Sequence, residues 1–357
     1  MQIKRKKTRV IQIGKLKIGG SSPIIVQSMT KSKLENLDCI RGEIRELAGS
    51  GCELIRIAIP DKKSIYYLKK LIGEKIFKVP LVADIQFDYR LALECMDIGV
   101  DGIRINPGNI GDSSRVSKII EKAKRKKVAI RIGINSGSID KKILKKNKGS
   151  IAGSMVESAL ENVRLLESIK FNNFKISAKA SSVMDTINVY EAISSKVDYP
   201  LHLGVTEAGP PFRGSIKSSV GLGILLSRGI GDTIRVSLTG KSTDEVEAAY
   251  IILYSLNLRE VGVDIISCPT CGRATDDFQQ IVYEIEKLTA GIKKNLKLAI
   301  MGCIVNGPGE AKDADLGIAF GEKKAALFLK GRVIKRVEKN IAVEEFGKEL
   351  EKINLNK

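Results

Sequence analysis

The chain of 357 residues contains no tryptophan and a single histidine, and aromatic residues make up only 5% of it. A platform on which nucleic-acid bases stack is therefore not indicated. The chain also lacks a run of about 18 apolar residues, which a membrane-spanning helix needs. We expect a protein that binds neither nucleic acid nor a membrane.

Cysteines are few, six in all, and no basic segment followed by an apolar stretch opens the chain as in a secretory signal peptide. A disulfide framework is therefore not expected, and a reducing cytoplasm is the consistent compartment.

Acidic residues are fewer than basic ones: 41 Asp and Glu stand against 60 Lys and Arg, which gives a net charge of +19. This excess is typical of solvated faces or of a protein that attracts anionic partners, with nucleic acid as the remaining alternative.

Three cysteines lie in two short loops rich in Gly and Pro near the C-terminus. Cys268 and Cys271 belong to the first loop, CPTCGR, and Cys303 belongs to the second, GCIVNGPGE. A Cys-x-x-Cys pair with a distant third cysteine is a metal-ligand spacing. Structural zinc usually takes four protein ligands, and a second pair is absent. The pattern favours an iron–sulfur cubane, with zinc and a redox dithiol as alternatives.

Short runs rich in Ile and Val alternate with amphipathic helical segments from residue 23 onward, as in buried parallel sheets. The eight runs are Pro23–Met29, Glu53–Ile59, Pro80–Ile85, Gly102–Ile105, Val128–Ile134, Phe174–Ala178, Leu201–Val205 and Asp232–Leu238. Eight strand–helix units predict an α/β fold of the (β/α)8, or TIM, barrel type. A doubly wound open sheet is the alternative, although no Gly-x-Gly-x-x-Gly follows the first strand.

The pattern changes near residue 260, so we expect a barrel domain at residues 1–260 and a small α/β domain at residues 261–357. Asn257 to Ser267 is expected to be a linker. In the second domain we expect helices at Thr275–Leu288 and Ala342–Ile353, and strands at Lys297–Met301, Leu316–Phe320, Ala325–Leu329 and Arg332–Ile334. Lys330-Gly331 is a predicted hairpin turn. The other cysteines, Cys39, Cys52 and Cys95, are expected to be buried.

Polar residues, many of them cationic, lie at or just after the ends of the predicted barrel strands. They are Gln27, Ser28, Arg56, Asp84, Arg104, Asn106, Arg131, Asn135, Ser177, Lys179, His202, Glu207, Arg235 and Ser237. The carboxyl ends of barrel strands meet at one mouth, so four arginines and a lysine would face one pocket. They would repel one another unless a ligand with several negative charges binds among them, and arginine forks match phosphate oxygens. The pattern predicts a site for a polyphosphorylated small molecule.

The motifs CPTCGR and GCIVNGPGEAKDADLGIAFG resemble those of the 4-hydroxy-3-methylbut-2-enyl diphosphate synthase family of the non-mevalonate isoprenoid pathway, and the likeness covers nearly the whole chain. The absence of a large insertion between the domains fits the compact two-domain bacterial form. The resemblance implies a C-terminal domain similar to the iron–sulfur part of sulfite reductases, with a [4Fe-4S] cluster on Cys268, Cys271, Cys303 and Glu310. A carboxylate is a weakly held iron ligand that a substrate oxygen could displace.

The resemblance also implies the reaction, which is reductive ring opening and dehydroxylation of 2-C-methyl-D-erythritol 2,4-cyclodiphosphate to (E)-4-hydroxy-3-methylbut-2-enyl diphosphate. Flavodoxin or ferredoxin would donate the electrons. The implied substrate-binding residues are Arg56, Arg104, Asn106, Arg131, Asn135, Lys179, Arg235 and Ser237. His202 is expected either to join them or to be satisfied inside the barrel. Glu310, Glu207 and Asp84 are the candidate catalytic carboxylates.

The helix after the eighth strand would carry the chain about 20 Å away from the barrel mouth. The cluster domain would then struggle to reach the mouth of its own barrel. We therefore expect a head-to-tail homodimer in which each cluster domain closes the barrel of its partner, as the resemblance also implies. Two other functions stay open: a TIM-barrel enzyme acting on sugar phosphates with a structural metal cluster, and a zinc-ribbon nucleic-acid-binding protein.

Overall fold

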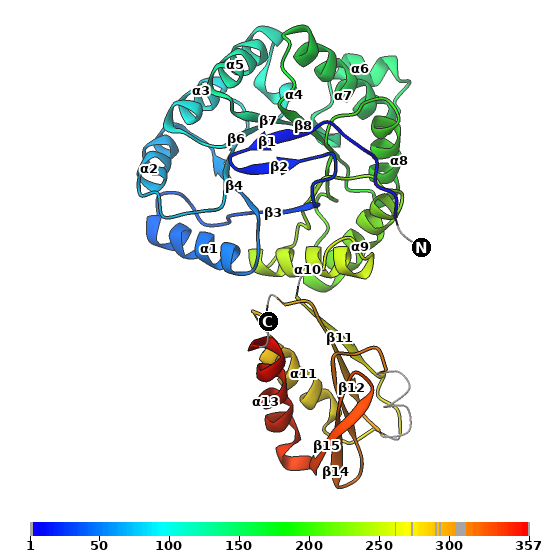
Figure 1. Ribbon diagram of the computed structural model, residues 1–357. Helices are drawn as coiled ribbons and strands as arrows, with labels where there is room; N and C mark the ends of the chain where they lie inside the picture. Colours follow the sequence, from blue (N-terminus) through cyan, green and yellow to red (C-terminus); the bar gives the residue numbers. More distant parts are fainter. Residues whose placement is uncertain are drawn as a thin grey trace. The chain divides into compact units, whose positions relative to one another are not determined.

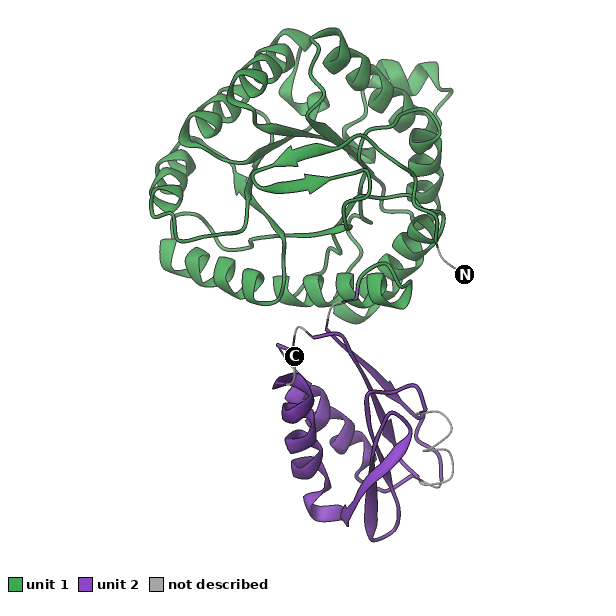
Figure 2. Ribbon diagram, in the orientation of Figure 1, with its two compact units in different colours: residues 1–259 green, residues 260–357 purple. Residues whose placement is uncertain are grey.

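The computed structural model describes residues 3–260, 262–272, 274–289, 291–292, 294–303 and 312–355. The chain divides into two compact units, Met1–Arg259 and Glu260–Lys357 (Figure 1, with the units coloured separately in Figure 2). Every helix in the described part of the chain is too short or too polar to cross a membrane.

Unit 1 is a (β/α)8 barrel, so the fold predicted from the periodic pattern is confirmed. Its strands are β3 (Ile25–Met29), β4 (Leu54–Ile59), β5 (Leu81–Ile85), β6 (Gly102–Ile105), β7 (Ala129–Asn135), β8 (Phe174–Lys179), β9 (His202–Leu203) and β10 (Thr233–Ile234). They are parallel and lie in the order β8-β7-β6-β5-β4-β3-β10-β9. A parallel bridge between Ile176 on β8 and Leu201 beside β9 brings the two ends of this order together.

Helices form the outer ring of unit 1 (Figure 1). They are α1 (Leu37–Gly49), α2 (Lys62–Gly73), α3 (Tyr89–Ile98), α4 (Pro107–Ile110), α5 (Ser113–Lys126), α6 (Lys141–Lys146), α7 (Ile151–Ser168), α8 (Val183–Ser194), α9 (Pro211–Ser227) and α10 (Ser242–Ser255), with a 3-10 turn, η1 (Ser136–Ser138). Short polar side chains cap many of them. Asp61, for example, accepts a hydrogen bond from the backbone N–H of Ser64 at 2.8 Å and satisfies a first-turn donor of α2.

A hairpin that the sequence analysis did not predict fills the amino end of the barrel. Its strands are β1 (Ile11–Ile13) and β2 (Leu16–Ile18), paired antiparallel. Three isoleucines of the hairpin pack in one buried cluster with residues at or next to the start of barrel strands: Ile11, Ile13 and Ile18 with Ile25, Leu54, Val82 and Ala129. Apolar side chains thus occupy this end of the barrel, and the polar residues lie toward the carboxyl ends of the strands.

Within its described residues, unit 2 is a five-stranded sheet with two helices on one face (Figure 1). The strands lie in the order β11 (Val263–Ser267), β12 (Leu296–Met301), β13 (Leu316–Phe320), β14 (Lys324–Leu329) and β15 (Arg332–Glu338), and the helices are α11 (Phe278–Thr289) and α13 (Ala342–Leu355). β11, β12 and β13 are parallel to one another, whereas β14 pairs antiparallel with both β13 and β15. Phe278 of α11 and Phe346 of α13 are buried against Leu298 and Ile318 of the sheet.

Two expectations about smaller features were wrong. The segment from Asn257 to Ser267 is not a linker throughout, because Val263–Ser267 forms β11 and pairs with β12. Cys39 is exposed on α1, whereas Cys52 and Cys95 are buried as expected. The predicted hairpin turn is confirmed, since Lys330 and Gly331 have φ angles of 46° and 75°, which a type I′ turn requires.

Candidate functional site

Strand register brings the predicted charged residues into one ring inside the barrel. Arg104 on β6 pairs with Asp84 on β5 and with Arg131 on β7, and Arg131 pairs with Lys175 on β8. Partners in neighbouring parallel strands point to the same face of the sheet. All four residues are at most 5% exposed. Lys175 was not predicted as a site residue, because it lies near the start of its strand and not at its end.

Asp84 lies between two of the arginines. Its Oδ1 accepts a hydrogen bond from Nη1 of Arg104 at 3.1 Å, and its Oδ2 lies 3.6 Å from Nε of Arg56. Burial raises the pKa of Asp84, but the positive charges of Arg56, Arg104 and Arg131 outweigh burial and lower the pKa overall. Asp84 is therefore an ionised carboxylate that holds guanidinium groups in place.

Glu245 on α10 is a second buried carboxylate, which the sequence analysis missed. Its Oε2 accepts hydrogen bonds from Nε of Arg235 at 3.2 Å and from Oγ of Ser28 at 2.8 Å. Its Oε1 accepts from the backbone N–H of Leu238 at 3.1 Å and lies 3.2 Å from Nζ of Lys31. An acidic residue in the first turn of a helix is common for reasons of the helix dipole alone, so its position carries no special signal of a site.

Positive charge outweighs negative charge in this interior. Burial, followed by the positive charges of Arg131 and Arg235, lowers the pKa of Lys179 well below its usual range. Burial, followed by the charges of Arg56 and Arg104, does the same for Arg131. The pKa of Arg56 is lowered to about 10, first by burial. A ligand with several negative charges would relieve this repulsion.

Unpartnered nitrogen atoms point to the same kind of ligand. Within the described residues, four buried nitrogens on the barrel strands lack a hydrogen-bond partner: Gln27 Nε2, Arg104 Nε, Arg131 Nε and His202 Nε2. Leaving a buried donor without an acceptor costs about 1–3 kcal/mol of folding free energy, so such atoms are rare in folded proteins. The interior therefore has donors in place for acceptor atoms from outside the chain.

The other predicted residues of β6, β7 and β8 lie at the carboxyl ends of these strands. Asn106 follows β6 and caps α4, accepting from the backbone N–H of Gly108 at 3.2 Å, while its Nδ2 donates to Oγ of Ser138 at 2.7 Å. Asn135 and Lys179 end β7 and β8, and they are register partners. The structure thus brings these polar groups to the same end of the barrel.

The predicted residues of the last two strands differ in exposure. His202 is fully buried, and its Nδ1 lies 2.8 Å from Oγ1 of Thr233. Ser237 is partly buried in the loop after β10. Glu207 is exposed in the loop after β9, with a left-handed φ of 52°. Glu207 therefore belongs to the loop region and not to the buried ring.

The cysteines of unit 2 lie at one edge of its sheet. Cys268 directly follows β11 and Cys303 follows β12, and these strands are parallel neighbours whose carboxyl ends meet. The backbone N–H of Gly302 donates a hydrogen bond to Sγ of Cys268 at 3.2 Å. Cys268 and Cys303 are partly buried and Cys271 is exposed, and none of the three is in a disulfide.

The donor chemistry of this edge fits a sulfur-ligated metal group. A backbone N–H directed at a cysteine sulfur stabilises the thiolate form that metals bind. Among the described residues, no three Cys, His, Asp or Glu side chains are grouped closely enough to hold a metal ion. Glu310 lies outside the described residues, as do its neighbours from 304 to 311.

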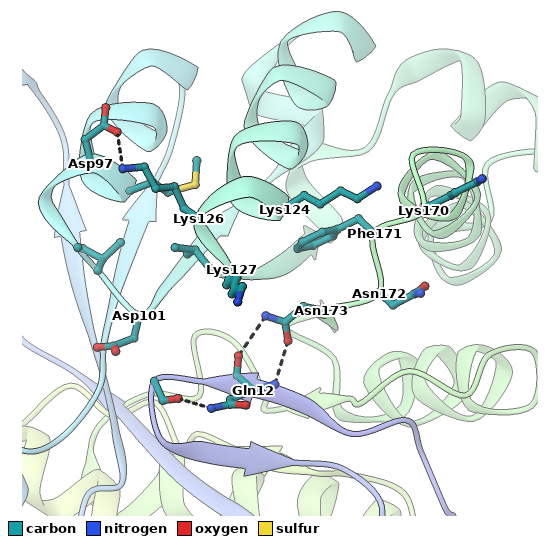
Figure 3. A pocket seen from close by; sticks show the side chains of 15 residues that line it. Gln12, Asp97, Asp101, Lys124, Lys126, Lys127, Lys170, Phe171, Asn172 and Asn173 are labelled. Carbon is teal, nitrogen blue, oxygen red and sulfur yellow. Dashed lines mark hydrogen bonds and ion pairs between the residues drawn. The ribbon is translucent and has the colours of Figure 1, made fainter.

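A hollow of about 790 Å³ lies at the opposite end of the barrel, among segments that precede β6, β7 and β8 (Figure 3). Two of its lysines form contacts with neighbouring segments of the barrel. Lys124 Nζ donates to the carbonyl oxygen of Ile169 at 3.1 Å, just after α7, and Lys126 pairs with Asp97 at 3.4 Å. Cations at helix C-termini are favourable in themselves. The polar residues predicted for the site, such as Asn135 and Lys179, lie at the other end of the barrel, where the strands end.

Comparison with known proteins agrees with this architecture. Residues 8–250 match a family model described as the GcpE TIM-barrel domain, and residues 264–352 match the GcpE protein C-terminal domain. A 4-hydroxy-3-methylbut-2-en-1-yl diphosphate synthase (flavodoxin) of Caldanaerobacter subterraneus is 51% identical over 349 residues, covering 98% of both chains. The protein of the same name from Lawsonia intracellularis is 49% identical over 355 residues, again covering 98% of both chains.

Among solved structures, dihydropteroate synthase from Yersinia pestis matches with 16% identity and a TM-score of 0.49, covering 70% of this chain and 98% of that chain. The two family models and the curated relatives together span nearly the whole sequence. The resemblance inferred from the cysteine motifs is thereby confirmed, and the chain belongs to the GcpE family.

Proposed function

We propose that the protein is a 4-hydroxy-3-methylbut-2-en-1-yl diphosphate synthase. It would convert 2-C-methyl-D-erythritol 2,4-cyclodiphosphate to (E)-4-hydroxy-3-methylbut-2-enyl diphosphate by reductive ring opening and loss of a hydroxyl group. The observation that carries the proposal is the ring of buried cations with unpartnered donors, in a chain 51% identical to a protein of that name. The negative charges of a cyclic diphosphate match this surplus.

The phosphate groups would bind to the arginine forks and to Lys179. We assign this role to Arg56, Arg104, Arg131 and Arg235, with Asn106, Asn135, Ser237 and His202 as polar neighbours. Asp84 and Glu245 hold three of the arginines in position through the contacts described above. Fixed guanidinium groups need little rearrangement when the substrate binds, which favours both affinity and orientation.

We propose that Cys268, Cys271 and Cys303 hold a [4Fe-4S] cluster, with Glu310 as the fourth ligand implied by the motif. Such a cluster, when bound, supplies electrons one at a time. The N–H of Gly302 would stabilise the negative charge on Sγ of Cys268. The thiols require a reducing compartment, for which we propose the cytoplasm.

A proton must reach the hydroxyl group that leaves as water. Asp84 is a poor source, because neighbouring arginines lower its pKa and keep it ionised. We assign proton transfer to the carboxyl group of Glu207, in the exposed loop at the carboxyl end of β9. Glu310 is the alternative donor, and a Glu207→Gln variant that keeps full turnover would favour it.

We propose that the working unit is a homodimer in which the cluster unit of one copy closes the barrel of the other. Arg259, the last residue of unit 1, supports this arrangement. Its Nη1 donates to the carbonyl oxygen of Ile24 at 2.6 Å and pairs with Glu53 at 3.1 Å, both at the amino end of the barrel. The chain therefore leaves unit 1 at the end away from the cation ring.

An apolar face on α9 supports the same proposal. Phe212, Ile216 and Val220 are 80%, 51% and 48% exposed, and their four-residue spacing places them on one side of the helix. Contiguous exposed apolar side chains often mark a protein interface.

As electron donor we propose flavodoxin, which the names of the relatives include, or ferredoxin. The net charge of +19 would attract an acidic carrier.

Two experiments test the proposal. Anaerobic, reconstituted protein should convert the cyclic diphosphate with reduced flavodoxin, as followed by phosphorus NMR. Unchanged substrate would contradict the proposed reaction.

The second experiment tests whether the cluster unit of one copy closes the barrel of the other. An equal mixture of Cys268→Ser and Arg131→Met variants should recover about a quarter of the normal activity, because about half of the dimers contain one intact composite site out of two. Two inactive variants that stay inactive after mixing and subunit exchange would exclude it.

The alternative of a sugar-phosphate enzyme with a structural cluster makes a different prediction. Under that alternative, a Glu310→Gln variant keeps its turnover, since the cluster takes no part in the chemistry. Under the proposed function, turnover falls strongly while the barrel stays folded. Far-ultraviolet circular dichroism of the same sample separates lost chemistry from lost structure.

A further inference from the structure

We propose that Lys175, Thr233 and His202 form a hydrogen-bonded chain inside the barrel that takes up a proton from solvent when a polyphosphate anion binds. The inference rests on the proposed function, because it concerns the floor of the same site. It adds proton uptake to that site and gives Lys175 and Thr233 a role.

The geometry of the chain is set by one hydroxyl group. Oγ1 of Thr233 lies 3.3 Å from Nζ of Lys175 and 2.8 Å from Nδ1 of His202. The three residues are at most 1% exposed. A threonine hydroxyl has one hydrogen, so it can accept from one neighbour while it donates to the other. The protonation state of Lys175 is thus coupled to that of His202 through this hydroxyl group.

The hydrogen-bonded series ends at Nε2 of His202, which is available to a further partner. When Nδ1 of His202 accepts from Thr233, the ring hydrogen is on Nε2, and Nε2 has no partner in the described part of the chain. Tyr190 on α8 donates its hydroxyl to the backbone carbonyl of His202, which helps to fix the position of this residue. The series of hydrogen bonds therefore ends in a buried N–H group, which can donate a hydrogen bond to an anionic oxygen.

The charges around Lys175 disfavour its protonated form when the barrel is empty. Burial, followed by the charge of Arg131, lowers the pKa of Lys175 well below its usual range, although Asp232 acts in the opposite direction and Arg56 adds to the lowering. Asp232 is itself engaged, since it accepts from Thr8 at 2.8 Å and pairs with Arg5 at 3.4 Å.

The surroundings of His202 act in the same direction. Burial lowers its pKa first, followed by the positive charges of Arg131, Lys179, Lys175 and Arg56. An anion among the arginines replaces this repulsion by attraction, so the protonated form becomes favourable and a proton is bound. The affinity of the anion must then fall as pH rises, by up to tenfold per pH unit for each proton taken up.

Calorimetry measures this proton directly. The full-length, cluster-loaded protein is titrated with inorganic pyrophosphate at pH 7.5, in buffers whose heats of ionisation differ, and the slope of the observed heat gives the protons exchanged. Because pyrophosphate also titrates, the informative quantity is the difference between proteins. We expect the unmodified protein to take up about one proton more than a Lys175→Met variant.

Two further variants keep the test decisive. Thr233→Val conserves the shape of the side chain but removes the hydroxyl, and it should lower the proton uptake by at least half even if Lys175→Met folds poorly. The exposed control Lys62→Met should behave as the unmodified protein does. Equal uptake in Thr233→Val and the unmodified protein would overturn the inference and leave the proposed function standing. A failure of the unmodified protein to bind pyrophosphate would overturn both.

Discussion

Gly133 on β7 lies directly against the side chain of Arg104 on β6. A Cβ atom built on Gly133 would come within 2.6 Å of Nε of Arg104, and one built on Gly204 would come within 2.5 Å of Nζ of Lys179. Neither glycine has a left-handed φ, so backbone conformation does not require glycine at either position. The two glycines leave space inside the barrel for cationic side chains.

A Gly133→Ala substitution tests this relationship. The added methyl group should push the guanidinium of Arg104 away from Asp84, and we expect the affinity for the cyclic diphosphate to fall about tenfold, or about 1.4 kcal/mol. Titration calorimetry measures the affinity. The control is Gly42→Ala in α1, where a Cβ meets open space, and it should leave affinity unchanged. Equal affinity in both variants would show that Arg104 can move without consequence.

A Glu245→Gln substitution removes the charge that faces Arg235 and Lys31. Because Glu245 is only 1% exposed, the unfolding free energy should fall by about 3 kcal/mol, as measured by urea denaturation. The matched control is Glu35→Gln, whose partner Lys63 is exposed, and it should cost less than about 1 kcal/mol. Saturating cyclic diphosphate should recover part of the loss at Glu245. A loss no larger than that of the control would argue against a buried carboxylate that supports the ring.

The pH dependence of stability reports on His202, which is the sole histidine of the chain. Its pKa is about 6.5 in an unfolded chain and is lowered in the folded protein, first by burial. Below about pH 6.5 the unfolded chain therefore binds a proton that the folded chain does not. Stability falls with acid, by at most about 1.4 kcal/mol per pH unit from this group.

A His202→Asn variant should flatten this part of the curve between about pH 6.5 and 5. The measurement is the urea midpoint across that range, with the unmodified protein alongside. If the two curves run parallel, His202 exchanges its proton freely in the folded barrel, and the electrostatic description of the interior is wrong.

Cysteine substitutions separate cluster ligands from ordinary thiols. Cys268→Ala and Cys303→Ala should each lower the iron content of anaerobically reconstituted protein by more than half, because each removes a proposed thiolate ligand. Cys39→Ala, at an exposed position on α1, should retain full iron and sulfide. Zinc in place of iron in the unmodified protein would contradict the cluster assignment and favour a zinc ribbon.

The barrel could be predicted from sequence because buried parallel strands are continuous runs of Ile and Val. Such runs as Val128–Ile134 stand out between amphipathic helices. The β1–β2 hairpin could not be recognised, since each of its strands has three residues and the alternation is too short to distinguish from a loop. β11 lies in the segment expected to be a linker, and its five residues are only partly buried or exposed, so it lacks the fully buried run typical of the barrel strands.

The site was predictable where a residue ends a strand and less so elsewhere. Asn135 and Lys179 end β7 and β8 as barrel geometry predicts for a mouth, whereas Arg56, Arg104 and Arg131 lie before the ends of β4, β6 and β7. Lys175 lies too early in β8 for that argument, and Glu245 comes from a helix. The contact of Gly133 with Arg104 depends on the distance between two strands, which no local sequence pattern records.

The most direct test of the account is the electron paramagnetic resonance spectrum of reduced, anaerobic protein with and without the cyclic diphosphate. A cluster that acts on a ligand held in the barrel should give a reduced [4Fe-4S] signal that changes when the cyclic diphosphate is added. A signal that stays the same, in a sample where calorimetry shows the ligand to be bound, would contradict the account.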